Sequence, residues 1–384
     1  RVPEIRFVGF TEDWEQRKVK EFAIESEVKG HSGKDAKKLT VKLHNKGVYV
    51  ADEKIQGSDN TQYYIRRAGQ FIYGKQNFFN GAIGIVPKKL DKYESTKDVP
   101  AFDVSSDVNV DWLYYYIARP EIYKPQEALC TGTGSKRFHV NNFHNLSLAI
   151  PKMDEQIKIK EYFVHLDNLI TLHQRKCEET KKLKKYMLQK MFPQNGKRVP
   201  EIRFVGFTED WEQRKLSDIT LKIGSGKTPS GGKNAYVDDG IPLIRSQNIN
   251  NDRVDLEDIV FIDEETDNSM ENSRVFTDDV LLNITGASIG RSAVYRGKDK
   301  ANVNQHVCII RPTKDFDSDF IQLNLASNFG QKQIDASQAG GGREGLNFQE
   351  IGKMSFMFPS NQEQMKIGVY FNHIDYLITL HQCK

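Results

Sequence analysis

The sequence has few cysteines, and their spacing excludes two common small-domain scaffolds. The four cysteines, at positions 130, 177, 308 and 383, are scattered and form no Cys-x-x-Cys pair. This excludes a zinc ribbon and provides no disulfide framework. A chain without such a framework suits a reducing compartment, so we expect a cytoplasmic protein.

Long hydrophobic runs are also missing. No apolar stretch approaches the roughly 20 residues that a membrane helix requires, so we expect no membrane partner. The first residues lack the apolar core of a signal peptide and an initiating Met, so we expect the native N-terminus to lie upstream. The formal net charge of +3 neither demands nor excludes a nucleic-acid partner.

Nucleotide-hydrolysing motifs are incomplete. The segment Gly224–Thr228 resembles the end of a P-loop, but Leu221 stands where the phosphate cradle needs a Gly. Pro229 also interrupts the position where the phosphate-binding helix should extend. A Gly-rich surface turn is the favoured interpretation, and Lys227 with backbone N–H groups could still grip a DNA phosphate.

The sequence also lacks the motifs of a base-modifying methyltransferase and a clear set of metal ligands. The sequence contains no polar-Pro-Pro-aromatic tetrapeptide for a flipped base, and no strand followed by a Gly-rich cofactor turn. The helix histidines His165, His173, His373 and His381 have no acidic or Cys partners arranged as ligands, which favours polar positions along a helix seam. We therefore predict no catalytic residue and no metal or cofactor site on this chain.

What the sequence does contain is an internal duplication. Residues 1–18 recur without a mismatch as residues 198–215, and residues 359–384 repeat residues 151–176 with 16 of 26 positions identical. A period this long identifies two copies of one unit rather than a solenoid. The length of 384 residues also suggests more than one domain.

The second repeated segment predicts a long helix. Residues 154–191 contain no Gly or Pro, and a heptad-like seam runs through them, ending in His173, Cys177, Thr180, Lys184, Met187 and Met191. A helix of this length spans roughly 55 Å. We predict that it packs on its copy through Ile159, Phe163, Leu166 and Ile170 on one side and Ile367, Phe371, Ile374 and Ile378 on the other. Because the copy stops at Lys384, we expect the second half of the first helix to lack a partner in this chain.

The regions between the repeats predict mixed α/β domains. Short strands rich in Val, Ile, Phe and Tyr alternate with Gly, Asn and Asp turns, and one amphipathic helix is expected near 110–118 and another near 319–327. The predicted fold class is α+β, with two mixed α/β domains separated by two long antiparallel helices that form a coiled coil with pseudo-two-fold symmetry. The expected boundaries are an N-terminal repeat at 1–18, a first variable domain at 19–150, a central helix at 151–192, a linker with the second repeat at 193–215, a second variable domain at 216–358, and a C-terminal helix at 359–384.

Polar clusters in the variable domains are candidates for DNA contact, because Arg reads guanine and Asn or Gln reads adenine in the major groove. In the first domain the candidates are Arg66, Arg67, Lys75, Gln76, Asn77 and Lys136. In the second they are Ser225, Lys227, Thr228, Arg245, Gln247, Asn248, Ser288, Arg291, Asn304, Gln305 and Arg343. Each cluster alone is weak evidence for DNA contact, because ordinary surface loops contain the same residue types.

Each long helix starts with a strand–Pro–x–x–x–Glu–Gln pattern, at 150–156 and 358–364, and continues in the similar segments 169–174 and 377–382. With these motifs, the whole chain resembles the specificity subunits of type I restriction–modification systems. The segments 285–290 and 303–305 of the second variable domain are also similar to that family.

The resemblance implies a non-catalytic subunit that reads double-stranded DNA with two target-recognition domains. It implies two methyltransferase subunits that carry S-adenosylmethionine and methylate adenine. Two restriction subunits would add ATP- and Mg²⁺-dependent translocation and cleavage. Two alternatives from other classes remain open: a stand-alone P-loop NTPase or fused methyltransferase, which would bind nucleotide or cofactor by itself, and a coiled-coil scaffold without DNA contact.

Overall fold

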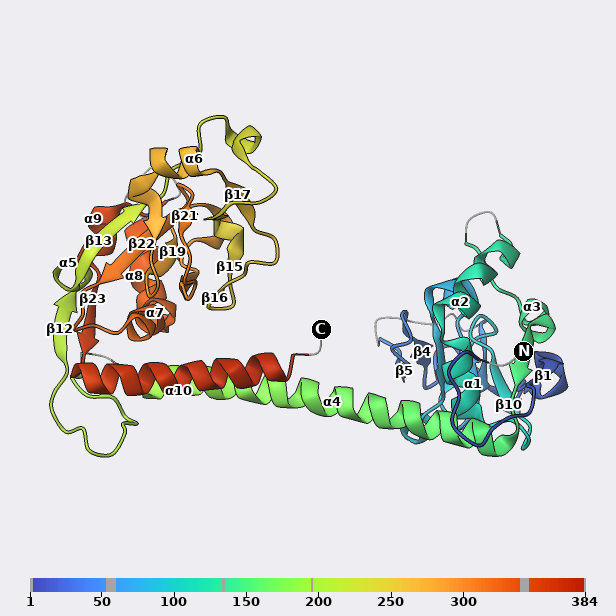
Figure 1. Ribbon diagram of the computed structural model, residues 1–384. Coiled ribbons are helices and arrows are strands. Elements are labelled where there is room, and N and C mark those ends of the chain that lie inside the picture. Colours follow the sequence, from blue (N-terminus) through green and yellow to red (C-terminus); the bar gives the residue numbers. More distant parts are fainter. Residues whose placement is uncertain (1–2, 53–59, 133–134, 195, 339–344, 383–384) are drawn as a thin grey trace. The chain divides into compact units, whose positions relative to one another are not determined.

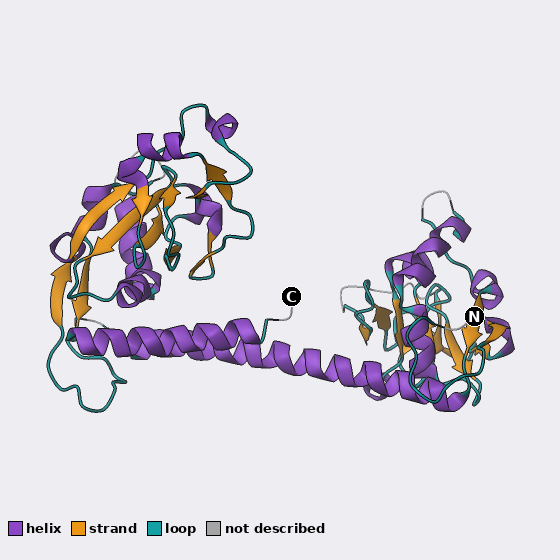
Figure 2. Cartoon of the chain, in the orientation of Figure 1, coloured by secondary structure: helices purple, strands orange, loops and turns teal. Residues whose placement is uncertain are grey.

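The computed structural model describes residues 3–52, 60–132, 135–194, 196–338 and 345–382. The chain packs as two compact units, Arg1–Ile170 and Thr171–Lys384. Each unit mixes short strands with helices (Figure 2), so the α+β prediction is confirmed. The boundary between the units falls inside a single helix, α4 (Met153–Lys190), which matches the predicted helix at 154–191.

Unit 1 is built on a four-stranded sheet of order β2-β10-β7-β8. Its strands are β1 (Glu15–Lys18), β2 (Ala23–Glu25), β3 (Lys29–Ser32), β4 (Leu39–Val41), β5 (Val48–Val50), β6 (Gln62–Ile65), β7 (Phe71–Tyr73), β8 (Ile83–Ile85), β9 (Glu94–Ser95), β10 (Ala101–Val104) and β11 (Ser147–Ile150). Its short helices are α1 (Val110–Ile117), α2 (Pro120–Tyr123) and α3 (Val140–Asn145).

The core of unit 1 lies between this sheet and two helices. The expected amphipathic helix near 110–118 is α1, which begins where the Asn109 side chain accepts a hydrogen bond from the Trp112 backbone N–H. Trp112 is buried with Phe71, Phe102 and Phe143 in one aromatic cluster. Large rings bury much apolar area per residue, so a few of them hold short strands together.

Unit 2 contains two four-stranded sheets, of order β13-β22-β19-β20 and β17-β14-β21-β18. Its strands are β12 (Glu212–Lys215), β13 (Thr220–Ser225), β14 (Ile241–Ile244), β15 (Ile249–Asn250), β16 (Arg253–Val254), β17 (Val260–Ile262), β18 (Arg274–Val275), β19 (Val280–Asn283), β20 (Ser292–Val294), β21 (Ala301–Val303), β22 (Val307–Pro312) and β23 (Ser355–Phe358). Its helices are α5 (Leu216–Ile219), α6 (Glu264–Ser269), α7 (Ser318–Ala326), α8 (Asn328–Gln338), α9 (Phe348–Lys353) and α10 (Asn361–Leu380).

The first sheet of unit 2 has the same plan as the sheet of unit 1. In each, the first strand pairs antiparallel with the last, the last with a middle strand, and that strand with the next along the chain. The predicted amphipathic helix near 319–327 is α7, capped by the Asp317 side chain. The duplication read from the repeats therefore extends to the sheets between them, where the two sequences differ almost everywhere.

Within unit 2, α10 lies antiparallel to the second half of α4 (Figure 1). The contacts between the helices show this antiparallel direction, because the residue numbers on α4 increase as those of their partners on α10 decrease. His173 meets His381, Cys177 approaches the carbonyl oxygen of Ile378, and Lys184 bonds Asp375.

Candidate nucleic-acid interface

In each unit, the 18-residue repeat forms the same ion pair with the start of a long helix. We call this contact the joint. In unit 1, the Arg6 guanidinium donates two hydrogen bonds to Glu155, at 2.6 and 2.7 Å. In unit 2, Arg203 donates two to Glu363, at 2.7 and 2.8 Å. Both Glu residues are buried at the start of a long helix, where a carboxylate also complements the helix dipole.

The neighbouring Gln explains the rest of the Pro–x–x–x–Glu–Gln pattern. Gln156 donates to the carbonyl oxygen of Pro151 at 2.9 Å and accepts from the Asn109 backbone N–H at 2.7 Å. Gln364 donates to the carbonyl oxygen of Pro359 at 2.9 Å and accepts from the Asp317 N–H at 3.0 Å. Each buried Gln thus ties the helix start to the residue that precedes or caps α1 or α7.

The repeats also supply an edge strand. β1 pairs with β11 in unit 1, and β12 pairs with β23 in unit 2, in both cases immediately before the long helix. The last strand of each variable domain therefore pairs with the repeat that precedes the domain, so the chain enters and leaves the domain through one strand pair.

Four loops of unit 2 meet at one end of its sheets. The carbonyl oxygen of Val303 lies so close to Gly226 that a Cβ there would be 1.7 Å away. The Asn304 N–H donates to the carbonyl oxygen of Ile244 at 3.0 Å, and the Asn283 amide donates to that of Ser246 at 2.9 Å. These contacts join the loops after β13, β14 and β19 to the loop between β21 and β22. We call residues 225–228, 245–248, 284–291 and 303–306 the loop end of unit 2.

A half-buried polar contact braces this loop end. Thr285 Oγ1 and His306 Nδ1 lie 2.6 Å apart, and the Ile284 N–H donates to the carbonyl oxygen of His306 at 3.0 Å. The Leu346 N–H in turn donates to the carbonyl oxygen of Ile284, so the chain at Leu346 also reaches this end.

Most of the residues predicted for the second domain come together here. Exposed side chains are Lys227, Thr228, Gln247, Arg291 and Gln305, and half-buried ones are Ser225, Arg245, Ser288 and Asn304. The Arg245 guanidinium donates to the carbonyl oxygen of Asp258 at 3.0 Å and lies 6.0 Å from the Tyr236 ring centroid. Arg343 lies outside the described residues.

Asn248 has a structural role instead. Its side chain is 2% exposed, accepts from the Arg245 N–H at 3.0 Å, and donates to the carbonyl oxygen of Asp255 at 3.1 Å. The prediction that this side chain is a DNA-reading amide is corrected: its polar atoms are used in holding the turn after β14.

The corresponding end of unit 1 carries part of the first cluster. Lys75 follows β7 as Thr285 follows β19, and its N–H donates to the carbonyl oxygen of Asp98 just before β10 at 2.8 Å. The Phe138 N–H donates to the carbonyl oxygen of Lys75 at 2.8 Å, which brings Lys136 to the same end. Gln76 is exposed and Asn77 half-buried in the turn that begins at Lys75.

The pKa values of Lys75 and Lys136 are shifted in opposite directions. Burial lowers the pKa of Lys75. The pKa of exposed Lys136 is raised by its hydrogen bond to Glu127, at 2.8 Å. Lys97, which the sequence did not single out, lies beside Asp98 and pairs with Glu27 at 2.9 Å.

Arg66 is wrong as a DNA-contacting residue. It is 1% exposed, and its guanidinium donates to Ser95 Oγ and to the carbonyl oxygen of Ser26, both at 2.7 Å. Burial lowers its pKa to about 10. Arg67 is exposed but pairs with Asp103 at 2.8 Å, before β7 begins and thus at the opposite end of the sheet from Lys75.

The helix pair uses a different part of α4 from the one predicted. On α10, Ile367, Phe371 and Ile374 are buried and Ile378 partly buried, as residues of the core cluster that also contains Met191. On the α4 side this cluster contains Met187 and Leu188, with Met191 directly after the helix, and Cys177 and Lys184 are buried further along α4. The expectation that the second half of α4 lacks a partner is therefore wrong, because antiparallel packing brings the start of α10 to the end of α4.

The four α4 residues predicted for this packing lie within unit 1. Ile159 packs against the unit 1 core, and the Phe163 ring stacks on Tyr115 with centroids 5.2 Å apart. Leu166 is half-buried, and Ile170 is 44% exposed.

Two copies of one joint, one sheet plan and one long-helix start define a duplicated α+β module with polar loops at one end of each sheet. The sequence model of the family described as "Type I restriction modification DNA specificity domain" matches residues 11–182 and 208–384. The chain belongs to this family, and its function is DNA sequence recognition within a type I restriction–modification system.

The chain is also similar to individual specificity subunits of type I restriction enzymes. The chain is 22% identical over 352 residues to the type I restriction enzyme MjaVIII specificity subunit of Methanocaldococcus jannaschii, covering 88% of this chain and 76% of that one. It is 31% identical over 163 residues to the EcoBI specificity subunit of Escherichia coli, covering 41% of this chain and 34% of that relative. The crystal structure of a type I system S subunit from M. genitalium has the same fold, with a TM-score of 0.62, 13% identity and coverage of 98% and 92%.

Among the described residues, no helix is long and apolar enough to cross a membrane. The same residues contain no group of three or more His, Cys, Asp or Glu side chains that could hold a metal ion.

Proposed function

We propose that this chain reads an asymmetric, bipartite DNA site: two short, different half-sites separated by an unread spacer. Residues 19–150 and 216–358 act as the two target-recognition domains, each presenting the loop end of its sheet to one half-site. The half-sites differ because the loops differ. In unit 1 the corresponding end presents Lys75, Gln76 and Lys136, whereas unit 2 presents Gln247, Arg291 and Gln305.

The observation that carries this proposal is the convergence of four separate loops of unit 2 at one end of its sheets. Residues far apart in the sequence, such as Lys227, Gln247, Arg291 and Gln305, are exposed there together. Arg, Asn and Gln side chains gathered on one surface suit base edges, whereas Lys and backbone N–H groups suit phosphates.

The chain itself is non-catalytic in this proposal. It directs two adenine methyltransferase subunits, which bind S-adenosylmethionine, and two restriction subunits, which use ATP and Mg²⁺. The P-loop alternative is disfavoured because Gly226 packs against the backbone of Val303, which leaves no open cradle at that glycine. The long helices set the distance between the two recognition domains and hence the spacer.

Mapping methylated adenines in genomes that carry or lack this gene, together with its partner subunits, tests the proposal. The expected result is one gapped sequence that is methylated only when the gene is present. A continuous methylated sequence, or methylation that is independent of the gene, would contradict it.

A further inference from the structure

A small hairpin links the loop end of unit 2 to the helix pair. β15 and β16 enclose a tip at Asn251 and Asp252, whose φ angles of 49° and 60° are left-handed. Asn and Asp tolerate this conformation best among residues with a side chain, and it suits a tight two-residue hairpin turn. The hairpin begins directly after Asn248, so its base is continuous with the loop that carries Arg245 and Gln247.

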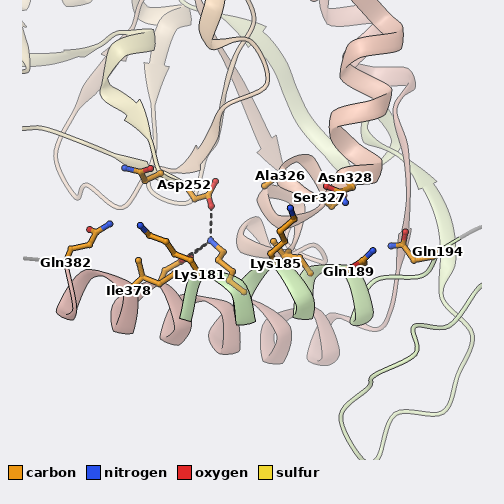
Figure 3. Close-up of a pocket in the computed structure, with 14 residues that line it drawn as sticks. Lys181, Lys185, Gln189, Gln194, Asp252, Ala326, Ser327, Asn328, Ile378 and Gln382 are labelled. Atoms are coloured by element: carbon orange, nitrogen blue, oxygen red, sulfur yellow. Dashed lines mark hydrogen bonds and ion pairs between the residues drawn. The ribbon is translucent and has the colours of Figure 1, made fainter. Parts of the chain in front are cut away.

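The tip ends in a charged contact with both long helices. Asp252 Oδ2 lies 2.8 Å from Lys184 Nζ on α4, and the same Nζ lies 2.7 Å from Asp375 Oδ1 on α10 (Figure 3). Lys184 is only 8% exposed. Burial acts to lower the pKa of Lys184, but the two carboxylates outweigh it and the pKa lies above its ordinary value. Lys184 therefore remains a cation beside the two carboxyl groups.

Further contacts hold the two residues that flank the hairpin tip, Asn250 and Arg253. Arg253 donates to the carbonyl oxygen of Asp375 at 2.8 Å and to Thr379 Oγ1. On the opposite strand, Arg291 of the loop end donates to the side-chain oxygen of Asn250, the cross-strand partner of Arg253. A change in the position of the tip would therefore also move an exposed arginine at the loop end.

The hairpin tip meets the helices beside open space. A cavity of about 410 Å³ adjoins it, lined among others by Lys181, Lys185, Gln189 and Asn328 (Figure 3). Charged and polar contacts, which are directional, thus connect the tip to the helices next to a cavity.

We propose that Asp252 and Arg253 are positioning residues that make the protein selective for spacer length. By fixing the hairpin on α4 and α10, they set the orientation of the loop end relative to the helices. This inference rests on the proposed bipartite reading. One extra base pair moves a half-site by about 3.4 Å and turns it by about 35°, so only a rigid joint would reject it.

The test compares the complete methyltransferase complex carrying the wild-type chain, Asp252→Asn or Arg253→Met. The substrates are duplexes with the mapped half-sites and spacers of the native length, one base pair shorter or one base pair longer. Asp252→Asn preserves side-chain size, and Lys182→Met serves as the matched control, since it removes an exposed α4 lysine outside the contact. The measured quantity is the ratio of methylation rates on native and altered spacers.

The expected result is that either variant lowers this ratio by at least about threefold while the half-site sequence stays the same. Lys182→Met should leave the ratio unchanged. An unchanged ratio in a folded Asp252→Asn chain, verified by circular dichroism, would overturn the inference. If that variant fails to fold, Arg253→Met decides by the same criterion. A wild-type complex that methylates no gapped site would instead refute the proposed function.

Discussion

Arg203 and Glu363 form a bidentate ion pair that fastens the second 18-residue repeat to the first turns of α10, with N–O distances of 2.7 and 2.8 Å. Glu363 is 0% exposed. The pair repeats that of Arg6 and Glu155, so each unit makes its own joint between repeat and helix. A buried carboxylate with a single guanidinium partner has a large penalty if that partner is removed.

Arg203→Met should therefore destabilise unit 2 by about 3 kcal/mol, because Glu363 would remain buried without its cation. Urea unfolding followed by circular dichroism measures the change. The matched control is Arg214→Met, which removes an exposed Arg that pairs with Glu212 in the same repeat. Equal destabilisation by both substitutions would rule out a special role for the buried pair.

Gly226→Ala should disrupt the loop end, because the new Cβ would overlap the backbone oxygen of Val303. We expect a lower melting temperature and weaker DNA binding, as the loops after β13 and β21 are forced apart. Gly224→Ala is the control, since a Cβ there meets only the flexible end of Lys222 at 3.7 Å. If Gly226→Ala melts and binds as the wild type does, the close approach of these loops is not required.

Gln305→Ala should reduce discrimination at one base position by about 1–3 kcal/mol, as expected for a lost base contact. Arg245→Ala should do the same at another position. Competition binding with single-base variants of the target measures this. Lys298→Ala, an exposed lysine after β20 and away from the loop end, should change neither affinity nor sequence preference. Uniform weakening across all sequences would assign Gln305 to phosphate contact.

Exchange of residues 216–358 for the corresponding domain of another specificity subunit should change one half-site only. The first and last strands of this domain's joint, β12 and β23, stay adjacent in any such exchange. Methylome sequencing of the hybrid gives the answer, with the exchange of 19–150 as the reciprocal control. A change in both half-sites would contradict independent reading by the two domains.

Stability of unit 1 should depend on the charge of His31. Its hydrogen bond to Glu94, at 2.6 Å, raises its pKa above the ordinary value of 6.5. The contribution is thus fully present below pH 6.5 and lost as the pH rises through the higher folded value. The free energy of unfolding should fall as the pH is raised from below 6.5. His31→Gln should abolish this fall, whereas substitution of the exposed α4 residue His165, His165→Gln, should leave the pH dependence unchanged.

Much of the fold was predictable because duplication and helix periodicity are explicit in the sequence. The seam through Cys177, Lys184, Met187 and Met191 does face α10. The antiparallel direction of the helices was predicted, but the residues that pair were not, since alignment of the copies suggests that equivalent positions meet. The packing instead places Phe371 near the end of α4, where it joins Phe192 in one core.

Candidate DNA-contacting residues were predicted less well, because residue type does not reveal burial. Arg66 and Asn248 look like reading side chains but satisfy backbone carbonyl groups inside their units. Conversely, the gathering of Gln247 and Gln305 depends on the parallel pairing of β14 with β21. Such a long-range pairing leaves no trace in local sequence patterns.

The adjacency of β1 with β11, and of β12 with β23, has an evolutionary consequence. Each recognition domain is a closed insertion whose two ends meet at a fixed strand pair, much as tolerated domain insertions have neighbouring termini. Residues gained or lost inside the insertion leave the geometry of its stem unaltered. Loop lengths, and with them the repertoire of readable sequences, are free to diversify under selection while the helices keep their register.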